Sequence, residues 1–284
     1  MFSPEKNIVE WRLQGINGGK AIILRDTEST HSLMKEMAKN ERVTPGTLIV
    51  ADSQSSGRGR HERTWKSPKG KNLYFNILVP LEGIPPQNYA QITQVAAIVL
   101  SDVFKSLESK DNDKGPAKES KITVKWPNDI LFGKAKFCGI LAEILILKNN
   151  EKALNLGIGI NINSTKADYA DIEREIITLS EICNKQINRE RLLQTILWNL
   201  ERALGQFKAF GIRPFVSAWR KMDKFIGCRG TIVIDRVCTE ENRDGNSHLE
   251  KKSGKILDMN DDGSLLFECD DGEIRKVYSA DLEI

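Results

Sequence analysis

The sequence is poor in the residues that build disulfide frameworks and metal centres. It has 5 cysteines and 3 histidines in 284 residues, and no two cysteines form a Cys-x-x-Cys pair. The cysteines are Cys138, Cys183, Cys228, Cys238 and Cys269. An odd and widely scattered set argues against a disulfide framework and against a structural zinc site. We therefore predict reduced, mostly buried thiols and no metal held by the protein itself.

Long apolar runs and a large charge of one sign are missing as well. No segment approaches the ~20 apolar residues of a membrane-spanning helix. Residues 1–12 mix charged and apolar side chains and have no small-residue cleavage site, unlike a secretory signal. The 42 basic and 39 acidic residues leave a net charge of +3, too balanced for a protein that mainly holds nucleic acid. These absences predict a cytoplasmic globular protein without a membrane role.

The hydrophobic pattern predicts helices at both ends of a region rich in strands. Apolar residues at three- and four-residue steps predict helices over 87–107 and 192–207, the second ending near Gly211. Runs rich in β-branched and aromatic residues predict strands at 47–51, 73–79, 122–126, 137–147 and 153–163. Short turns such as Phe132-Gly133-Lys134 make neighbouring strands antiparallel. Without regular βαβ alternation, this order predicts an α+β fold with a mixed sheet.

The pattern changes after Gly227, where short strands are interrupted by Asp-Asp-Gly at 261–263 and 270–272. Such a turn-rich segment is typical of a small β barrel. We therefore predict two domains, 1–226 and 227–284. The repeated Asp-Asp-Gly could also form a weak calcium loop, but hairpin turns explain it more simply. Residues 110–120 lack large apolar side chains and predict a solvated excursion to which we assign no function.

The densest chemical signal lies between Asp52 and Lys71. Gly57 and Gly59 leave backbone N–H groups open to close approach. Six cations fall in the same irregular segment: Arg58, Arg60, Arg63, Lys66, Lys69 and Lys71. This composition suits a phosphorylated ligand, and mutual repulsion predicts a loop that is mobile when empty and orders around a polyanion. An Arg-Gly segment that binds RNA and an ordinary solvated loop are the alternatives.

A second signal is a lysine at the end of a strand. Alternation places the apolar side chains of 122–126 on one face and Lys125 on the other, and Pro127 ends the strand. A lysine fixed by sheet geometry can meet an anionic ligand with little entropy left to lose. The alternative is an ordinary strand lysine beside a Pro-Asn-Asp turn.

A third signal is a strand with one nearly bare face. In residues 153–163 one face is made of leucine and isoleucine, whereas the other carries Asn155, Gly157, Gly159 and Asn161. Glycines weaken a strand unless something flat packs on its backbone, so this face predicts the floor of a ligand cleft. Gly139 extends the floor if it is not simply a bulge.

In this order the motifs resemble those of the biotin protein ligases. They are Ser29-Thr30, Gln54, Gly57-Arg58-Gly59-Arg60 with Trp65, Lys125-Trp126-Pro127-Asn128-Asp129, Gly139-Ile140-Leu141-Ala142-Glu143 and Gly157-Ile158-Gly159-Ile160-Asn161. The resemblance covers residues 21–284. It implies a catalytic domain like that of class II aminoacyl-tRNA synthetases and a small C-terminal SH3-like barrel, in agreement with the break at Gly227.

The resemblance also implies a reaction in two steps. The carboxylate of biotin attacks the α-phosphorus of ATP, which is accompanied by Mg²⁺, and biotinyl-5′-AMP then passes its acyl group to a lysine of a biotin carboxyl carrier protein. The carrier would belong to acetyl-CoA carboxylase or a related carboxylase. Ser29-Thr30 comes too early for the N-terminal helix-turn-helix of repressor members, so we expect a ligase without DNA binding, as a monomer or homodimer. A lipoate ligase on the same fold and an RNA-binding protein are the alternatives.

The same resemblance implies roles for individual residues. Lys125 and Arg60 would be catalytic. The biotin pocket would use Ser29, Thr30, Gln54, Arg58, Gly59, Arg60, Lys125 and Gly139. The adenylate would contact Arg60, Arg63, Trp65, Asn128, Gly157 and Asn161.

Two positions depart from the family pattern. Glu62 stands where the loop usually has glycine, and His31 stands where asparagine is common. Glutamate takes left-handed backbone angles less readily than glycine and adds a negative charge beside a phosphate site. We therefore expect Glu62 to alter loop closure and to pair with Arg60 or Arg63. The sequence leaves open whether Cys138, near the floor, is reactive.

Overall fold

The computed structural model describes residues 11–61, 63–108, 120–148, 150–172, 175–235, 249–278 and 280–284. A large sheet contains β1 (Ala21–Thr27), β2 (Leu48–Gln54), β3 (Leu73–Pro80), β4 (Ile122–Lys125), β5 (Asp129–Phe132), β6 (Ala135–Ile146) and β7 (Lys152–Ile160). A small sheet contains β8 (Arg229–Asp235), β9 (Leu249–Met259), β10 (Leu265–Cys269), β11 (Ile274–Val277) and β12 (Asp281–Glu283). The α-helices are α1 (Thr30–Lys39), α2 (Gln91–Glu108), α3 (Leu179–Cys183), α4 (Arg189–Phe210) and α5 (Arg213–Met222).

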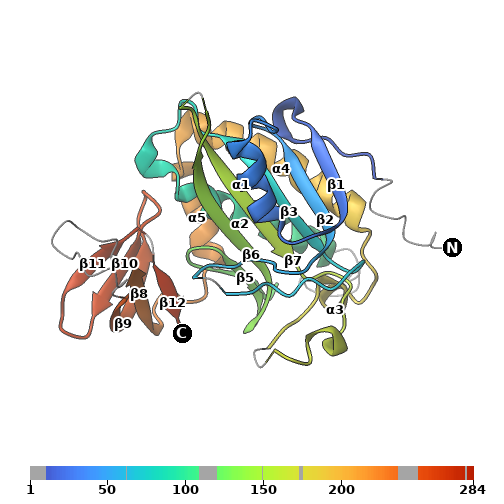
Figure 1. Ribbon diagram of the computed structural model, residues 1–284. Coiled ribbons are helices and arrows are strands. Elements are labelled where there is room, and N and C mark those ends of the chain that lie inside the picture. Colours follow the sequence, from blue (N-terminus) through green and yellow to red (C-terminus); the bar gives the residue numbers. More distant parts are fainter. Residues whose placement is uncertain are drawn as a thin grey trace.

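The large sheet is mixed. Its strand order is β1-β2-β3-β7-β6-β5-β4, and the small sheet has the order β11-β10-β9-β8-β12 (Figure 1). β1 and β2 pair in parallel, whereas the remaining neighbours in the large sheet are antiparallel. The small sheet is antiparallel throughout. These findings confirm the α+β class with a mixed sheet and a second β unit.

Several predicted boundaries shift for local reasons. The helix expected over 87–107 begins at Gln91, because residues 86–88 form a separate 3₁₀ turn. The second long helix begins at Arg189 behind an Asn188 cap and ends at Phe210, followed by the cap residue Gly211, whose φ of 66° fits a glycine. The sequence prediction lacks β1, β5, α1 and α3. The excursion expected at 110–120 lies outside the described residues except for Ser120.

The two faces of the large sheet have different coverings. Figure 1 shows α1 on one face and α2 with α4 on the other. Alternate residues of β3 and β7, such as Phe75 and Leu156, join the main core under α2 and α4. The opposite face packs a smaller apolar cluster under α1, which includes Met34 and Ala153. The predicted alternation of β7 is therefore confirmed, and its bare stretch lies on the α1 face.

A turn of the small sheet docks on the large one. Gln94 Nε2 on α2 and Trp126 Nε1 donate to the carbonyl of Gly263 at 2.6 and 3.3 Å. Gly263 has a φ of +77°, and a Cβ there would lie 2.4 Å from Gln94 Oε1, so only glycine fits. The first Asp-Asp-Gly is thus a docking turn, and the apolar core continues from the large sheet into the small one.

A buried ion pair ties α4 to the end of β2. Arg189 Nη1 lies 2.8 Å from Asp52 Oδ1 and 3.1 Å from the carbonyl of Asn72. The side chains are 3% and 12% exposed. The carbonyl of Asp52 also accepts from the backbone N–H of Gly70 at 3.2 Å, so the pair anchors both ends of the cation-rich segment.

Within the described residues, no helix combines the length and apolar character needed to cross a bilayer.

We predict that Arg189→Met lowers the free energy of unfolding by about 3–5 kcal/mol, because it leaves the Asp52 carboxylate buried without its partner. Urea unfolding followed by circular dichroism measures this change. Lys69→Met is the control, since Lys69 pairs with Asp26 on the open surface and should leave the unfolding midpoint unchanged. Equal midpoints for the two variants would show that the buried pair adds nothing.

Candidate functional site

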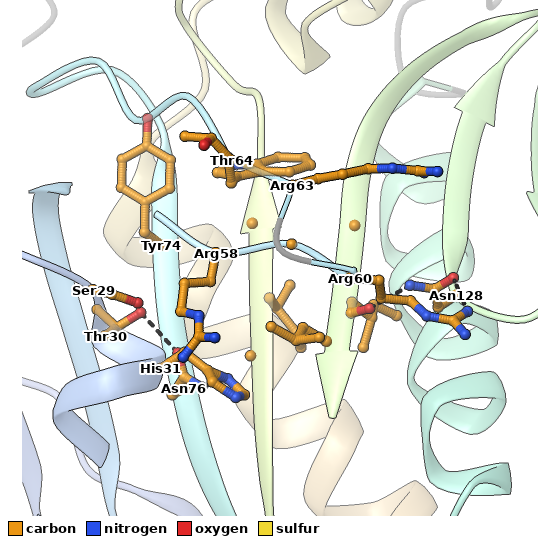
Figure 2. Close-up of a pocket in the computed structure, with 18 of the residues that line it drawn as sticks. Ser29, Thr30, His31, Arg58, Arg60, Arg63, Thr64, Tyr74, Asn76 and Asn128 are labelled. Atoms are coloured by element: carbon orange, nitrogen blue, oxygen red, sulfur yellow. Dashed lines mark hydrogen bonds between the residues drawn. The ribbon is translucent and has the colours of Figure 1, made fainter. Parts of the chain in front are cut away.

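A cleft that is partly open to solvent lies on the α1 face of the large sheet. Its walls come from the N-terminus of α1, the cation-rich loop after β2, the strands β3, β5, β6 and β7, and Asp281 of the small sheet. Residues distant in the sequence therefore meet here because the sheet order brings β7 between β3 and β6. Figure 2 shows this pocket with the residues of the loop above the sheet.

The floor of the cleft is formed by glycines that lie under an indole ring. Gly139 and Gly159 are opposite each other in the β6–β7 pair. A Cβ at Gly159 would lie 2.6 Å from Trp65 Cε2, and one at Gly139 would lie 3.0 Å from Trp65 Cζ3. The flat group that packs on these glycines is thus the protein's own Trp65. Gly157, which the sequence assigned to the adenylate, faces Asn76 and His31 instead.

The N-terminus of α1 brings Ser29 and Thr30 to one wall. Ser29 caps the helix by accepting from the Ser32 N–H. Thr30 donates from its backbone N–H and its hydroxyl toward Gln54 Oε1, at 2.9 and 3.0 Å. Arg58 points from the loop toward Thr30 and His31 (Figure 2). The structure therefore brings together four residues that the resemblance assigned to biotin.

The cation-rich loop has a defined fold. Gly59 N–H donates to the Arg63 carbonyl at 2.7 Å, and Trp65 N–H donates to the Gly57 carbonyl at 2.8 Å, which closes a small hairpin. The left-handed backbone lies at His61, with a φ of 49°. Glu62 itself lies outside the described residues, so its effect on loop closure stays a prediction.

The negative charge that balances this loop comes from the small sheet. Asp281 carboxylate oxygens lie 3.3 Å from Arg60 Nη1, His61 Nε2 and Arg63 Nη2. The Asp281 side chain is only 12% exposed. Burial lowers the pKa of the Arg60 guanidinium, and the charge of Asp281 raises it. Sequence reasoning missed Asp281 because nothing near residue 281 indicates that it reaches the loop.

Lys125 lies at the end of β4, partly buried, and it is not among the residues that line the cleft. Burial lowers the pKa of its ammonium group, and the nearby Asp129 carboxylate raises it. A second lysine does line the cleft: Lys136 Nζ lies 2.6 Å from Asp129 Oδ1 and 5.5 Å from the Trp65 ring centroid. The sequence signal for Lys136, a lysine three residues before Gly139, was too ordinary to be noticed.

The two asparagines assigned to the adenylate have different surroundings. Asn128 lines the cleft, donates to the Ile140 carbonyl at 2.6 Å and accepts from Arg60 Nη1 at 3.4 Å. Asn161 is buried outside the lining, where its Oδ1 accepts from the Tyr169 hydroxyl at 2.9 Å. The structure thus supports only Asn128 as a residue that faces the cleft.

None of the four thiols in the described residues lines the cleft. Cys138, Cys183 and Cys269 are buried, Cys228 is exposed, and Cys238 lies outside the described residues. Burial raises the pKa of the Cys138 thiol well above its usual range, so it is not a reactive thiolate. One group in the described chain, Cys269 with Asp271 and Glu273, has ligand atoms close enough for a metal ion, but Lys252 and Arg275 pair with its carboxylates.

The mixed sheet and its cation-lined cleft suit an enzyme that brings anionic substrates together, and similarity to known proteins gives the family. Residues 23–163 match the Biotin/lipoate A/B protein ligase family. The chain is 32% identical over 268 residues to the bifunctional ligase/repressor BirA of Bacillus subtilis, covering 94% of this chain and 74% of that protein. The chain therefore belongs to the biotin protein ligase family.

Two further relatives agree. The biotin–[acetyl-CoA-carboxylase] ligase of Mycobacterium tuberculosis is 24% identical over 213 residues, covering 75% of this chain and 74% of that protein. The structure of the biotin protein ligase from Aquifex aeolicus in complex with biotin and ATP superposes with a TM-score of 0.70 at 26% identity, covering 93% of this chain and 97% of that chain. The similarity includes the small sheet as well as the large one.

We predict that Gly159→Ala lifts Trp65 from the floor, because a methyl group would lie 2.6 Å from the indole. Biotin-dependent exchange of pyrophosphate into ATP should fall roughly 100-fold, the order expected for an ångström-scale misplacement of reacting groups. Proteolysis within residues 55–71 should accelerate. Gly205→Ala is the control, since Gly205 lies in α4 with nothing within 4 Å of a new Cβ. Wild-type rates for Gly159→Ala would contradict the close approach.

Proposed function

We propose that this chain activates biotin with ATP and transfers the biotinyl group to a carrier lysine. A carboxylate oxygen of biotin attacks the α-phosphorus of MgATP, the bond to pyrophosphate breaks, and biotinyl-5′-AMP forms. The carrier amine then attacks the acyl carbon and releases AMP. The observation that carries this proposal is the single cleft in which a polar pocket at α1 adjoins the arginines of the loop.

The pocket has the chemistry of both substrates. Ser29, Thr30, Gln54 and Arg58 form the end that suits biotin, whose ring system is largely apolar with a few hydrogen-bonding edges. Arg60, Arg63 and Asn128 form the end that suits the phosphate of the adenylate. The Trp65 Nε1–H is buried without a hydrogen-bond partner among the described residues, which supports a ligand contact there. We retain Gly59 and Gly139 in the biotin set, and we leave Asn161 out of the adenylate set because its side chain is bonded to Tyr169 and does not line the cleft.

We assign Lys125 to the first step, the formation of biotinyl-5′-AMP. Two anions, a carboxylate and a triphosphate, must approach each other, and a fixed cation between them stabilises the transition state. Lys125 forms no ion pair among the described residues, whereas Lys136 is paired with Asp129. We therefore propose that Lys125 turns into the cleft when both anions bind.

The carrier and the type of ligase are further proposals. The acceptor is a biotin carboxyl carrier protein of acetyl-CoA carboxylase or a related carboxylase, as the names of relatives suggest. The modest net charge supports a ligase that does not bind DNA, which a mobility-shift assay tests. A cytoplasmic location and a monomeric or homodimeric state also stay predictions. Lipoate is the rival substrate within the family, and competition between biotin and lipoate in pyrophosphate exchange decides between them.

We predict that Lys125→Ala lowers biotin-dependent pyrophosphate exchange by about 10²–10³-fold, the order of effect seen when one transition-state charge partner is lost. The melting temperature should not change, because Lys125 lies off the apolar face. Lys121→Ala, an exposed lysine just before the same strand, is the control and should exchange normally. Near-normal exchange by Lys125→Ala would remove this lysine from the mechanism.

We propose that the boundary between 1–226 and 227–284 separates two sheets and not two independent cores, because the apolar core and the cleft both include residues from each side of the boundary.

We predict that Asp281→Asn makes residues 55–71 more sensitive to protease in the free protein, because the loop loses its counter-charge. Biotin with ATP should restore protection by supplying phosphate. Asp271→Asn, which removes the partner of Lys252 on the small sheet, is the control. Equal cleavage of Asp281→Asn and the wild-type protein would show that Asp281 does not hold the loop.

A further inference from the structure

His31 lines the cleft but has no part in the reaction as proposed so far. It lies in the first turn of α1, is 5% exposed, and is one of the two positions at which the chain departs from the family pattern. Both ring nitrogens have partners: Nδ1 lies 3.0 Å from Asn76 Nδ2, and Nε2 lies 3.1 Å from Glu143 Oε2. A buried ring with two fixed partners has a defined protonation state, and its neighbours reveal which one.

The hydrogen-bond directions around His31 follow from one obligate acceptor. The His31 carbonyl can only accept, so Asn155 Nδ2 must face it, at 3.0 Å. Asn155 Oδ1 then faces Asn76 and accepts from Asn76 Nδ2 at 2.7 Å. The amide nitrogen of Asn76 is thereby fixed toward His31, and Nδ1 of the ring must accept. The ring is neutral, and its proton is on Nε2, where it is donated to Glu143.

The same chain of bonds orients the hydroxyl of Thr30. With its nitrogen toward His31, Asn76 presents Oδ1 to Thr30 Oγ1 at 2.7 Å. Gln54 also presents its Oε1 to Thr30 Oγ1. This orientation of the amide is fixed because its Nε2 donates to Ser67 Oγ and its Oε1 accepts from the Thr30 N–H. Thr30 has one hydroxyl proton and two inward acceptors. Its proton is therefore used inside the protein, and its oxygen is left to accept from a ligand.

We propose that His31 is a positioning residue for biotin, which fixes Asn76 so that Thr30 accepts a hydrogen bond from the cyclic urea N–H of the substrate. This inference rests on the proposed function of the cleft. The proposed role of His31 requires a hydrogen-bond acceptor at the position of its Nδ1. The contact between Nε2 and Glu143 holds the ring in place and is secondary.

Burial, more than the surrounding charge, keeps the His31 ring neutral. Burial lowers the pKa of His31 below its usual 6.5, and Arg58 from the loop and Lys35 from α1 lower it further, whereas Glu143 from β6 raises it. Protonation would turn Nδ1 into a donor that faces the Asn76 amide donor. Relief of that clash requires Asn76 to rotate, which breaks its bond to Asn155 and turns an N–H group toward Thr30. Acid should therefore weaken biotin binding through this network.

Three substitutions separate the two ring nitrogens. The Oδ1 of His31→Asn can replace the Nδ1 acceptor, the amide nitrogen of His31→Gln can replace the Nε2 donor, and His31→Leu supplies neither. We expect His31→Leu and His31→Gln to raise the KM for biotin about tenfold, the effect of one lost hydrogen bond. The KM for ATP should stay within about threefold in both variants. His31→Asn should keep the KM for biotin within about threefold of the wild-type value.

The pH dependence of the KM for biotin is a second measurement. It would not change with the titration of His31 if the residue had only a structural role. In the wild-type protein the KM for biotin should rise as the pH falls below the usual His value of 6.5. In His31→Asn, which has no ring to titrate, the KM should stay flat over the same interval. If His31→Leu does not fold, the comparison of His31→Asn with His31→Gln and this profile decide the question.

Three results would overturn the inference while leaving the proposed function intact. They are wild-type biotin affinity in His31→Leu, equal loss of biotin and ATP affinity in that variant, and biotin binding by His31→Gln that is as tight as by His31→Asn. A wild-type protein that exchanges pyrophosphate with lipoate and not with biotin would instead overturn the proposed function, and the inference with it.

Discussion

The close approach of Trp65 to the backbone of Gly139 and Gly159 is the constraint on which the site depends. A side chain at Gly159 would enter the indole, so the ring can lie on the sheet only because two adjacent strands both lack a Cβ at this level. Once the indole is seated, the hairpin that carries it holds Arg58, Arg60 and Arg63 above the sheet. Packing of one aromatic ring on two glycines thus converts a charged loop into the roof of a cleft.

Electrostatic balance accounts for the packing of several cations in this roof. Arg60, Arg63 and His61 share the carboxylate of Asp281, and the base of the loop is anchored by the buried pair of Arg189 and Asp52. Under the proposed function, a phosphate that enters the cleft would compete with this carboxylate for Arg60 and Arg63. The small sheet thus contributes a charged residue to the cleft, while its Gly263 turn fixes it to α2.

The other end of the cleft is governed by hydrogen-bond direction. Asn155, Asn76, His31 and Glu143 form a chain in which every amide orientation is determined by the His31 carbonyl. The chain ends at Thr30, whose hydroxyl is left as an acceptor. In a buried network of this kind a change at one member is transmitted to the next, because an unpaired donor or acceptor is costly where water is absent.

The sequence by itself determined the fold class, the two long helices, the bare face of β7 and the strands of the large sheet from β2 onward except β5, because these elements follow a local period of apolar residues. It also placed Thr30, Gln54, Arg58, Arg60 and Asn128 in one site through the resemblance of their motifs. Only the tertiary structure brought in Asp281, Lys136 and Asn76, and only it removed Asn161 from the cleft. These contacts join strands far apart in the chain, and sheet order and side-chain direction, which decide them, leave no local pattern in the sequence.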